Sequence, residues 1–294
     1  VAAEARTRGL TIHVGRIFEI CVEKNAELPG NDPRRKFKGR VVFQGNQVRD
    51  QNSEDALFGD LSSSPATMEA GKACDCYSLV PGHVGQQADA ESAYTQSRLG
   101  GTVTTWVRLP PHQWPEGWKG ITDPVCPLVL ALYGHPDAGG YWERHCEAHL
   151  KKVGFEPIPS WRSCFFHPKL RLFLIVYVDD FKMSGPEEHM AEGWALIREG
   201  IKMDDPTPME HFLGCTHKEG LARLADGSLV RTMEYDMQHF FESCVQLYQD
   251  LIDPKVRWRA AATPFLDESS VDSSRPSADG SWYQCPHCEG RYPE

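Results

Sequence analysis

The sequence predicts an α+β fold, and three observations lead to this prediction. Segments with strand-like and with helix-like spacing both occur, but they do not alternate strictly as βαβ units do. Residues 170–185 open with an almost unbroken apolar run, which indicates a buried strand. Residues 139–155 form the most convincing amphipathic helix, with Tyr141, Trp142 and Leu150 on one stripe.

Length and composition place the chain among globular proteins. Its 294 residues suffice for one large or two ordinary domains, and 40% hydrophobic with 24% charged residues argues against disorder. No apolar run reaches membrane-spanning length, no secretory signal opens the chain, and the absence of an initiator Met predicts a segment of a longer protein. The ten cysteines are mostly scattered, which favours reduced thiols in an intracellular, non-secreted protein.

The formal net charge of −10 argues against a protein that coats nucleic acid by bulk charge. Local basic surface is still expected at residues 33–40, "PRRKFKGR", for which a solvated loop is the alternative interpretation. We predict a basic groove that includes Arg34 to Arg40 and faces the acidic residues described below.

The expected elements of the first half follow from turn signals and apolar spacing. A break rich in Pro and Gly at 27–36 separates the first two, and Ser64-Pro65 precedes a helical pattern. These elements are a strand at 16–23, a strand or hairpin at 37–48, a helix at 66–80, a strand passing into a helix at 83–99, and a strand at 102–111.

In the second half, helices and strands are expected to follow one another, and the last part of the chain is expected to be a linker without regular structure. Its elements are the helix at 139–155, two or three strands within 163–185, a helix at 186–201, strands within 209–233 and a helix at 234–251. After about residue 266 the chain is rich in Ser, Asp and Pro, which indicates a linker. Near its end, Cys285 and Cys288 form half of a zinc site, either a truncated zinc knuckle or an unstructured tail.

Two adjacent acids, Asp179 and Asp180, stand at the end of the apolar run, where unpaired charge is costly. A strand that ends there and reverses direction places both carboxylates on a hairpin tip. A divalent cation such as Mg²⁺ would relieve their repulsion and also bind substrate phosphates. Asp89, where a strand gives way to a helix-like run, is the expected third acid, and the N–H groups after it are expected to face a triphosphate.

An ordered series of motifs resembles the reverse transcriptases of copia-like retrotransposons. "ADAESAY" lies upstream of "YVDD", and "KFKGRVVFQG" is similar to the family's "KARLVARG". "WVRLPP" is similar to "YMEQPPGF", "VCPLVLALYG" to "VCKLKKSLYG", "MEHFLG" to "LKYFLG" and "RAAATPF" to "KPVSTPL". The resemblance covers residues 35 to 268.

The resemblance implies an RNA-directed DNA polymerase that transfers a nucleotide from a dNTP to a primer 3′-OH. Asp89, Asp179 and Asp180 would bind two Mg²⁺ ions, with Mn²⁺ as an alternative, as in two-metal phosphoryl transfer. Tyr94 would be the steric gate that rejects a ribose 2′-OH. The other implied contacts are Lys38 and Arg40 to the triphosphate, Tyr177 to the primer terminus, and Phe212, Leu213 and Gly214 as primer grip.

A right-hand polymerase is the fold that the resemblance implies. Residues 1–268 would contain fingers, a ferredoxin-like palm and, from about residue 234, a partial thumb, with 269–294 as linker and truncated CxxC tail. Its partners would be dNTPs and an RNA or DNA template with primer. It would not bind a membrane. The RNase H and integrase regions of the same polyprotein would lie outside this chain. The protein itself would act inside the cell, in a cytoplasmic particle or the nucleus.

Three residues depart from the family pattern. Glu91 stands where Lys or Arg is usual, Asp137 where Gln is usual, and Gly140 where Arg is usual. A decayed or repurposed palm that binds nucleic acid or a protein partner without synthesis is therefore the alternative prediction. A palm-like nucleotidyl cyclase is disfavoured, because a turn of the Gly-Gly-Asp-Glu type is absent. His145 and His149 have the spacing of metal ligands on a helix, although His149 is expected to face solvent.

Overall fold

A computed structural model of the chain describes residues 1–24, 30–33, 35–59, 63–252, 282–284 and 291–293. These residues belong to two units, Val1–Met237 and Gln238–Glu294, and each unit is described by itself. Helices and antiparallel strands are mixed in the first unit, so the predicted α+β class is confirmed. No helix within the described ranges is both long and apolar enough to span a bilayer.

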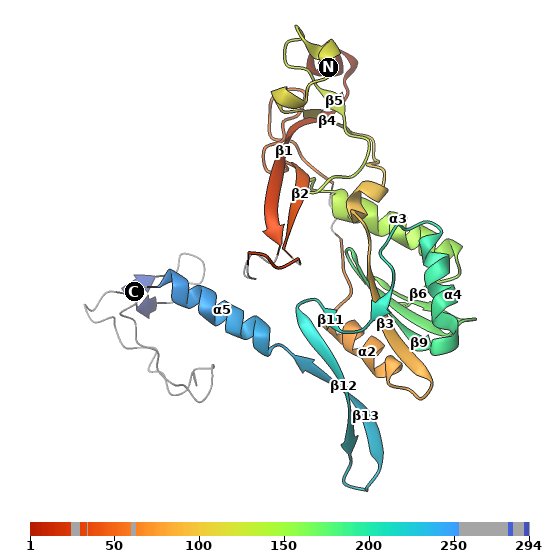
Figure 1. Ribbon diagram of the computed structural model, residues 1–294. Coiled ribbons are helices and arrows are strands. Elements are labelled where there is room, and N and C mark those ends of the chain that lie inside the picture. The colour runs from red at the N-terminus through yellow and green to blue at the C-terminus, as the bar shows by residue number, and fades with distance from the viewer. Residues whose placement is uncertain (25–29, 34, 60–62, 253–281, 285–290, 294) are drawn as a thin grey trace. The chain divides into compact units, whose positions relative to one another are not determined.

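A six-stranded antiparallel sheet is the centre of the first unit (Figure 1). Its strand order is β10-β3-β9-β8-β7-β6. The strands are β3 (His83–Asp89), β6 (Glu156–Pro157), β7 (Cys164–His167), β8 (Leu172–Tyr177), β9 (Asp180–Pro186) and β10 (Thr207–Pro208).

Three helices cover the two faces of this sheet. Apolar side chains of α3 (Ala138–Lys152) and α4 (Glu187–Arg198) share a buried cluster with Leu172, Leu174 and Val176 of β8. The intervening residues Phe173 and Ile175 pack instead with α2 (Met68–Ser78) on the opposite face. Because both faces of β8 are buried, its sequence is a continuous apolar run rather than an alternating one.

Local sequence signals account for the beginnings of these helices. The Thr67 hydroxyl accepts a hydrogen bond from the Ala70 N–H at 3.3 Å and so caps α2. Two glutamates, Glu187 and Glu188, occupy the first turn of α4, where carboxylates interact favourably with the helix dipole. The helices predicted at 66–80, 139–155 and 186–201 are thereby confirmed, each with shorter bounds.

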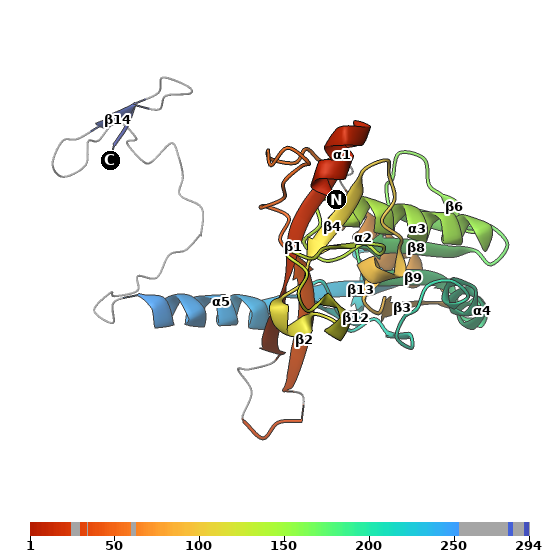
Figure 2. The ribbon, with the colours of Figure 1, turned by 90° about the horizontal axis from the view of Figure 1, so that it is seen from above.

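A second sheet, with order β2-β1-β4-β5, is built from the N-terminal part of the first unit (Figure 2). β1 pairs antiparallel with β2 and parallel with β4. Its strands are β1 (Ile12–Lys24), β2 (Lys36–Phe43), β4 (Thr104–Arg108) and β5 (Cys126–Pro127). The short helices of this region are α1 (Ala2–Arg8), η2 (Pro111–Gln113) and η3 (Glu116–Trp118), whereas η1 (Ala93–Gln96) packs in the apolar cluster that contains α3.

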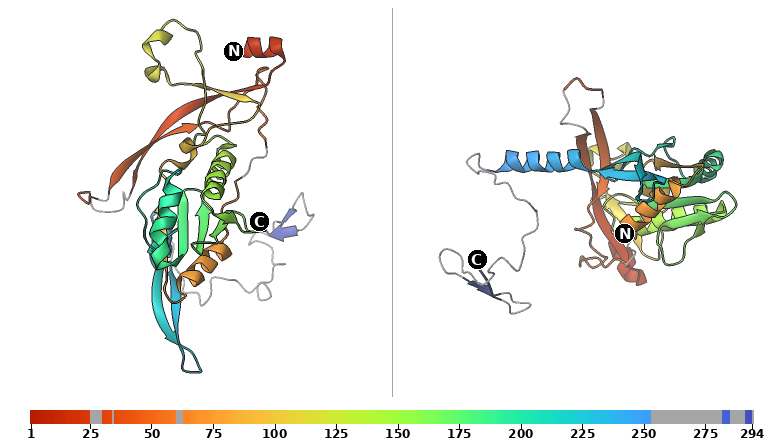
Figure 3. Two further views of the ribbon diagram at one scale, coloured as in Figure 1. Left: turned by 90° about the vertical axis from the view of Figure 1, so that its right-hand side faces the viewer. Right: turned by 90° about the horizontal axis from the view of Figure 1, so that it is seen from below.

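A third sheet consists of β11 (His211–Phe212), β12 (Cys215–Arg223) and β13 (Leu229–Asp236). The β12–β13 hairpin is the long cyan pair of strands in Figure 3. Leu213 and Gly214 join β11 to β12, and both have positive φ, 50° and 78°, as a two-residue type I′ turn requires.

The helix predicted at 234–251 begins later than expected. Residues 234–236 continue β13, and α5 (Gln238–Leu251) starts the second unit. The described part of that unit also contains the paired strands β14 (Trp282–Gln284) and β15 (Arg291–Pro293).

Candidate active site

The acids predicted from the sequence meet at one end of the six-stranded sheet. Val178 and Asp179 form the turn between β8 and β9, and Asp180 is the first residue of β9. In the strand register Asp180 lies opposite Asp89 of β3 on one side and opposite Tyr177 of β8 on the other. Directly opposed residues of antiparallel strands share a face, so the three side chains are neighbours.

The turn that carries the acids is strained and firmly held. Val178 has φ of 59° at the first turn position, where glycine is usual and a β-branched residue is rare. The Trp142 indole N–H donates to the Val178 carbonyl at 2.6 Å, and the Ala90 N–H donates to the Asp179 carbonyl at 2.7 Å. Strain that persists under such restraint is typical of functional sites.

Negative charge accumulates around Asp180. Burial, followed by the neighbouring charges of Asp89 and Asp179, raises the pKa of Asp180 to about 7. A hydrogen bond with the Asp89 carboxyl favours the protonated form as well. Among the described residues, no group of three or more His, Cys, Asp or Glu side chains is arranged as a ready metal site. The donor chemistry nevertheless fits a hard cation, since carboxylate oxygens are the ligands Mg²⁺ prefers and a cation would relieve the repulsion.

The raised pKa of Asp180 predicts a pH dependence of stability in metal-free protein. Folding raises this pKa from 3.8 to about 7, so between these values the folded state binds more protons than the unfolded state. The free energy of unfolding therefore falls as the pH rises through this window. Asp180→Asn removes this pH dependence. The free energy of unfolding of the variant minus that of the natural chain should therefore be larger at pH 8 than at pH 4. Urea unfolding in EDTA measures this, and an equal difference at both pH values contradicts it.

Two aromatic rings and a guanidinium lie beside the acids. The Tyr94 ring, in η1, is 4.8 Å from the Tyr133 ring, and the Arg40 guanidinium lies 5.6 Å from the Tyr133 ring centroid. Burial and, secondarily, the charge of Asp179 raise the pKa values of both tyrosines. The predicted gate residue, the predicted triphosphate contact and one of the acids are therefore within electrostatic reach of one another.

Tyr133 was not predicted as a site residue, although it lies in the "LYG" motif. Its position depends on Gly134, which has φ of 84° and whose added Cβ would lie 2.2 Å from the Phe43 carbonyl oxygen. The Tyr133 carbonyl accepts a hydrogen bond from the Phe43 N–H at 2.7 Å. The glycine after Tyr133 was the signal that could have revealed this close approach of β2.

Lys38 lies two residues before Arg40 in β2, so both side chains share one face of the strand. Lys36 shares that face and pairs across the ribbon with Lys24. Burial, then the charges of Lys24 and Arg40, lower the pKa of Lys38, while Asp179 opposes this. Lys38, within the span predicted to form a basic groove, is therefore within electrostatic reach of Asp179, whereas Arg35 of the same span pairs with Glu23. Arg34 lies outside the described residues.

The segment after Asp89 differs from the prediction. The expected helix is replaced by the short η1, which begins only at Ala93. The Glu91 N–H donates to the Lys202 carbonyl at 3.0 Å, and the Ala90 N–H is used by Asp179 as described. The first two N–H groups after Asp89 therefore contact protein carbonyls, and the expectation that they face a triphosphate is wrong for them.

The structure accounts for the orientation of Glu91. Its carboxylate lies 2.5 Å from the Lys202 ammonium, in an exposed ion pair that raises the pKa of Lys202. Asp137 precedes α3, and burial raises the pKa of its carboxyl. Gly140 is buried within α3. The charge of Glu91 is thus paired with a lysine, whereas in the described part of the chain the Asp137 carboxylate forms no ion pair and is influenced only by the charges of His13 and Arg144.

The predicted primer-grip residues form an anchored turn. Phe212 is 7% exposed and packs in the apolar cluster between α2 and β8, whereas Leu213 in the turn is 49% exposed. Gly214 completes the type I′ turn. Tyr177 is 36% exposed and lies directly opposite Asp180 in the pairing of β8 with β9.

The remaining predicted ligands do not form a metal site in the described part of the chain. His149 does not simply face solvent, because its Nε2 lies 2.9 Å and 3.1 Å from the carbonyls of Ile197 and Leu196 at the end of α4. It therefore contributes to the packing of α3 on α4. Cys285 and Cys288 lie outside the described residues.

An antiparallel sheet that carries acids at one end, beside a strand with basic residues, is the arrangement expected of a nucleotidyl-transfer enzyme. Residues 25–235 match the model of the family described as reverse transcriptase (RNA-dependent DNA polymerase). The chain belongs to this reverse transcriptase family. The resemblance found in its motifs is thereby confirmed.

Comparisons with individual proteins are distant. No curated protein matches the chain. Among solved structures, the chain is similar to a telomerase from Candida albicans in complex with a fragment of telomeric RNA, at 10% sequence identity and a TM-score of 0.30. The match covers 78% of this chain and 46% of the telomerase chain, so the present chain corresponds to less than half of that protein.

Proposed function

We propose that this chain is the RNA-directed DNA polymerase segment of a copia-like retrotransposon polyprotein. The observation that carries the proposal is the opposition of Asp89 and Asp180 at one end of the six-stranded sheet, with Asp179 adding to the charge that raises the pKa of Asp180. Family membership supports the same reaction, transfer of a nucleotide from a dNTP to a primer 3′-OH with release of pyrophosphate.

The architecture supports the assignment of polymerase subdomains. The elements β3-α3-β8-β9-α4-β10 follow the β-α-β-β-α-β order of ferredoxin-like folds, with both helices on one face. We assign this part as the palm and the β2-β1-β4-β5 sheet as the fingers. The helix α5 is the candidate for the thumb.

The acids and their neighbours have separable roles in the proposed reaction. Bound Mg²⁺ or Mn²⁺ would supply charge neutralisation on the reacting phosphate and polarise the primer 3′-OH. Asp89, Asp179 and Asp180 would hold two such ions. The turn between β8 and β9, which carries Asp179 and leads into Asp180, is already restrained, so little reorganisation is needed during the reaction. Tyr177, on the same row as Asp180, would pack against the primer terminus.

The incoming nucleotide would lie between the acids and β2. Arg40 and Lys38 would contact its triphosphate, since both lie on the β2 face that interacts with Asp179 and Tyr133. Tyr94 would stand beneath the sugar and exclude a 2′-OH by its bulk. The ion pair of Glu91 with Lys202 keeps the unusual carboxylate compensated.

The proposed partners are an RNA or DNA template with its primer, bound mainly through backbone and shape. The RNase H and integrase regions would belong to the same polyprotein outside this chain. The proposed site of action is inside the cell, in a cytoplasmic particle or the nucleus.

Primer extension tests the proposal. The chain is incubated with a DNA primer on an RNA template, or on a DNA template of the same sequence, with dNTPs and Mg²⁺. Extension on RNA supports the proposal. Absence of extension by folded protein that also fails to bind Mg²⁺ in the presence of dNTP favours the alternative, a non-catalytic palm.

Tyr94→Ala should relax selection against ribonucleotides. Removing the ring opens space for a 2′-OH, and we expect the ratio of kcat/KM for dNTP over rNTP to fall by about a hundredfold, as for loss of a steric contact of a few kcal/mol. Single-nucleotide incorporation kinetics measure the ratio. Tyr141→Ala, which removes another tyrosine, is the control, and an unchanged ratio in Tyr94→Ala contradicts the gate assignment.

A further inference from the structure

Lys182 of β9 is a buried charge that the proposed reaction does not use. Its side chain is 1% exposed. Along β9, Phe181 and Met183 point to the apolar cluster with α3 and α4. Asp180, Lys182 and Ser184 alternate with them and therefore face the other side, towards α2. Lys182 thus lies on the same face of the sheet as Asp180, two residues further along β9.

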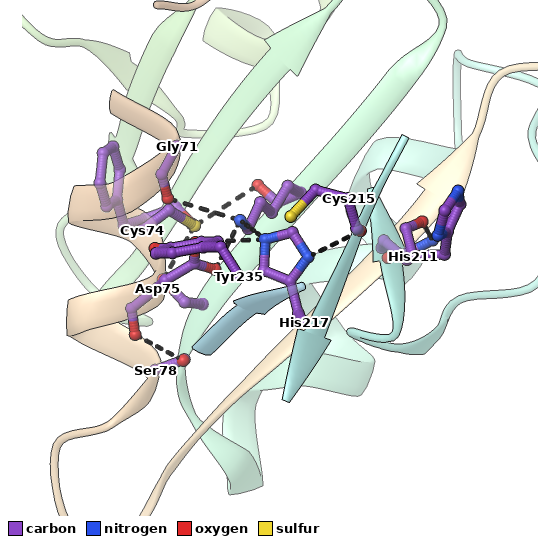
Figure 4. Close-up of polar contacts among 12 residues, drawn as sticks. Gly71, Cys74, Asp75, Ser78, His211, Cys215, His217 and Tyr235 are labelled. Carbon is purple, nitrogen blue, oxygen red and sulfur yellow. Dashed lines mark hydrogen bonds and ion pairs between the residues drawn. The ribbon is translucent and has the colours of Figure 1, made fainter. Parts of the chain in front are cut away.

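The partner of Lys182 is Asp75 of α2. The Lys182 ammonium lies 2.5 Å from Asp75 Oδ1, and the Asp75 side chain is only 2% exposed. The Tyr235 hydroxyl donates to Asp75 Oδ2 at 2.8 Å, and His217 Nε2 lies 3.4 Å from the same oxygen (Figure 4). Oδ2 therefore accepts a hydrogen bond, whereas Oδ1 is compensated by its ion pair with the Lys182 ammonium.

This cluster, which we call the Asp75 set (Asp75, Lys182, His217 and Tyr235), joins three parts of the palm region. Asp75 comes from α2, Lys182 from the strand that begins with Asp180, and His217 and Tyr235 from β12 and β13. The Lys182 ammonium also lies 5.0 Å from the ring centroid of Phe212, the residue before the Leu213–Gly214 turn. One buried carboxylate thus links the acidic strand to the proposed primer grip.

Apolar packing does not fill the space beside the Asp75 set. A pocket of about 570 Å³, open on one side, lies between α2, β8 and the third sheet. It is lined by Ala66, Met68, Ile175, Phe212, Leu213 and Met237, with Asp75 and Lys182 also in its wall. The attachment of the hairpin here therefore combines the polar contacts of the Asp75 set with the packing of Phe212.

We propose that the Asp75 set positions the β11–β12 turn and the β12–β13 hairpin against the acid-bearing strand, and so orients the primer 3′ end. Asp75 and Lys182 are then positioning residues, which act through the hairpin. The inference rests on the proposed polymerase function. A misplacement of about 1 Å at such a support can lower a reaction rate about a hundredfold without altering any reacting group.

Other contacts hold the same hairpin, so its loosening can be studied without its loss. Arg231 of β13 donates to the carbonyls of Ser78 and Val80 at 3.3 Å and 3.4 Å. The Gln87 side chain donates to the His211 carbonyl at 2.7 Å. Removing the Asp75 set should therefore increase the motion of the hairpin while the palm sheet remains folded.

The test uses the full chain with two variants and a matched control. Tyr235→Phe removes one hydroxyl from Asp75, and the double variant Asp75→Asn/Lys182→Met removes both buried charges at similar volume. Tyr77→Phe removes a hydroxyl that donates to the Arg171 carbonyl at 3.0 Å, between β7 and β8, and not to Asp75. Amide hydrogen exchange and single-nucleotide incorporation are measured on each.

We expect exchange in residues 215–236 to become about tenfold faster in both variants, with β8 unchanged, because local opening is made easier. The kcat for incorporation should fall about tenfold with the KM for dNTP unchanged, and Tyr77→Phe should match the natural chain. Unchanged exchange in the double variant overturns the inference, as does faster exchange with unchanged kcat. If the natural chain extends no primer, the proposed function fails, while exchange still decides whether the Asp75 set holds the hairpin.

Discussion

The double variant Asp179→Asn/Asp180→Asn should lose primer extension, with a rate at least about a thousandfold below that of the natural chain. Asn keeps the shape of each side chain but removes the negative charge that would hold the metal ions. Preorganised charge at the reacting phosphate is commonly the largest contribution to such catalysis, and loss of a single donor already costs about a hundred- to a thousandfold. Gel-based extension on an RNA template measures the loss.

The fold of this variant should be retained. Because the pKa of Asp180 is already raised to about 7, a neutral side chain suits its surroundings. Asp55→Asn serves as control, since the Asp55 side chain is 86% exposed in a surface ion pair with Arg49. Extension that persists in the double variant, or that is lost equally in the control, would show that these acids do not form the active site.

Asp75→Ala should destabilise the chain by about 3–5 kcal/mol, the cost typical of removing one partner of a buried ion pair. The variant leaves Lys182, which is 1% exposed, without its counter-charge, and it deprives the Tyr235 hydroxyl of its acceptor. The free energy of unfolding, from urea titration of the full chain, measures the effect.

A mutant cycle separates the ion pair from simple loss of packing. Asp75→Ala/Lys182→Met should be less destabilised than Asp75→Ala alone, because the second change removes the unpaired charge. Asp55→Ala, which breaks the exposed pair with Arg49, should cost less than about 1 kcal/mol. If the loss of stability in the double variant equals the sum of the losses in Asp75→Ala and in Lys182→Met alone, the two buried charges are not energetically coupled.

The sequence predicted the elements that depend on local signals. The run at 172–177 was recognised as a buried strand because both of its faces are apolar, and the helix at 138–152 because its apolar residues follow a helical period. Asp179 and Asp180 were chosen because they end the apolar run, and Asp89 because it stands where a strand gives way to a helix-like run; the strand register brings Asp89 and Asp180 together. Their roles in the reaction are still predictions.

The tertiary structure overrode local pattern where backbone groups found distant partners. The run after Asp89 has helical spacing, yet its N–H groups bond to Asp179 and to Lys202, which lie far along the chain. The segment 234–236 resembled the start of a helix, but it remains a strand paired with β12, from which Tyr235 reaches Asp75. A local stretch of sequence contains only one partner of each such hydrogen bond, so it cannot predict the bond.

The sequence by itself determined the fold class, the reverse transcriptase family and the acids at the turn, because apolar periodicity and motif order are written along the chain. Only the tertiary structure decided that Lys182 is buried against Asp75, that Tyr133 lies beside Tyr94, and that Glu91 pairs with Lys202. Each of these depends on which residues meet across separate elements. Whether a charge is compensated depends on which residues lie next to it in the folded chain, and the residue type alone does not determine this.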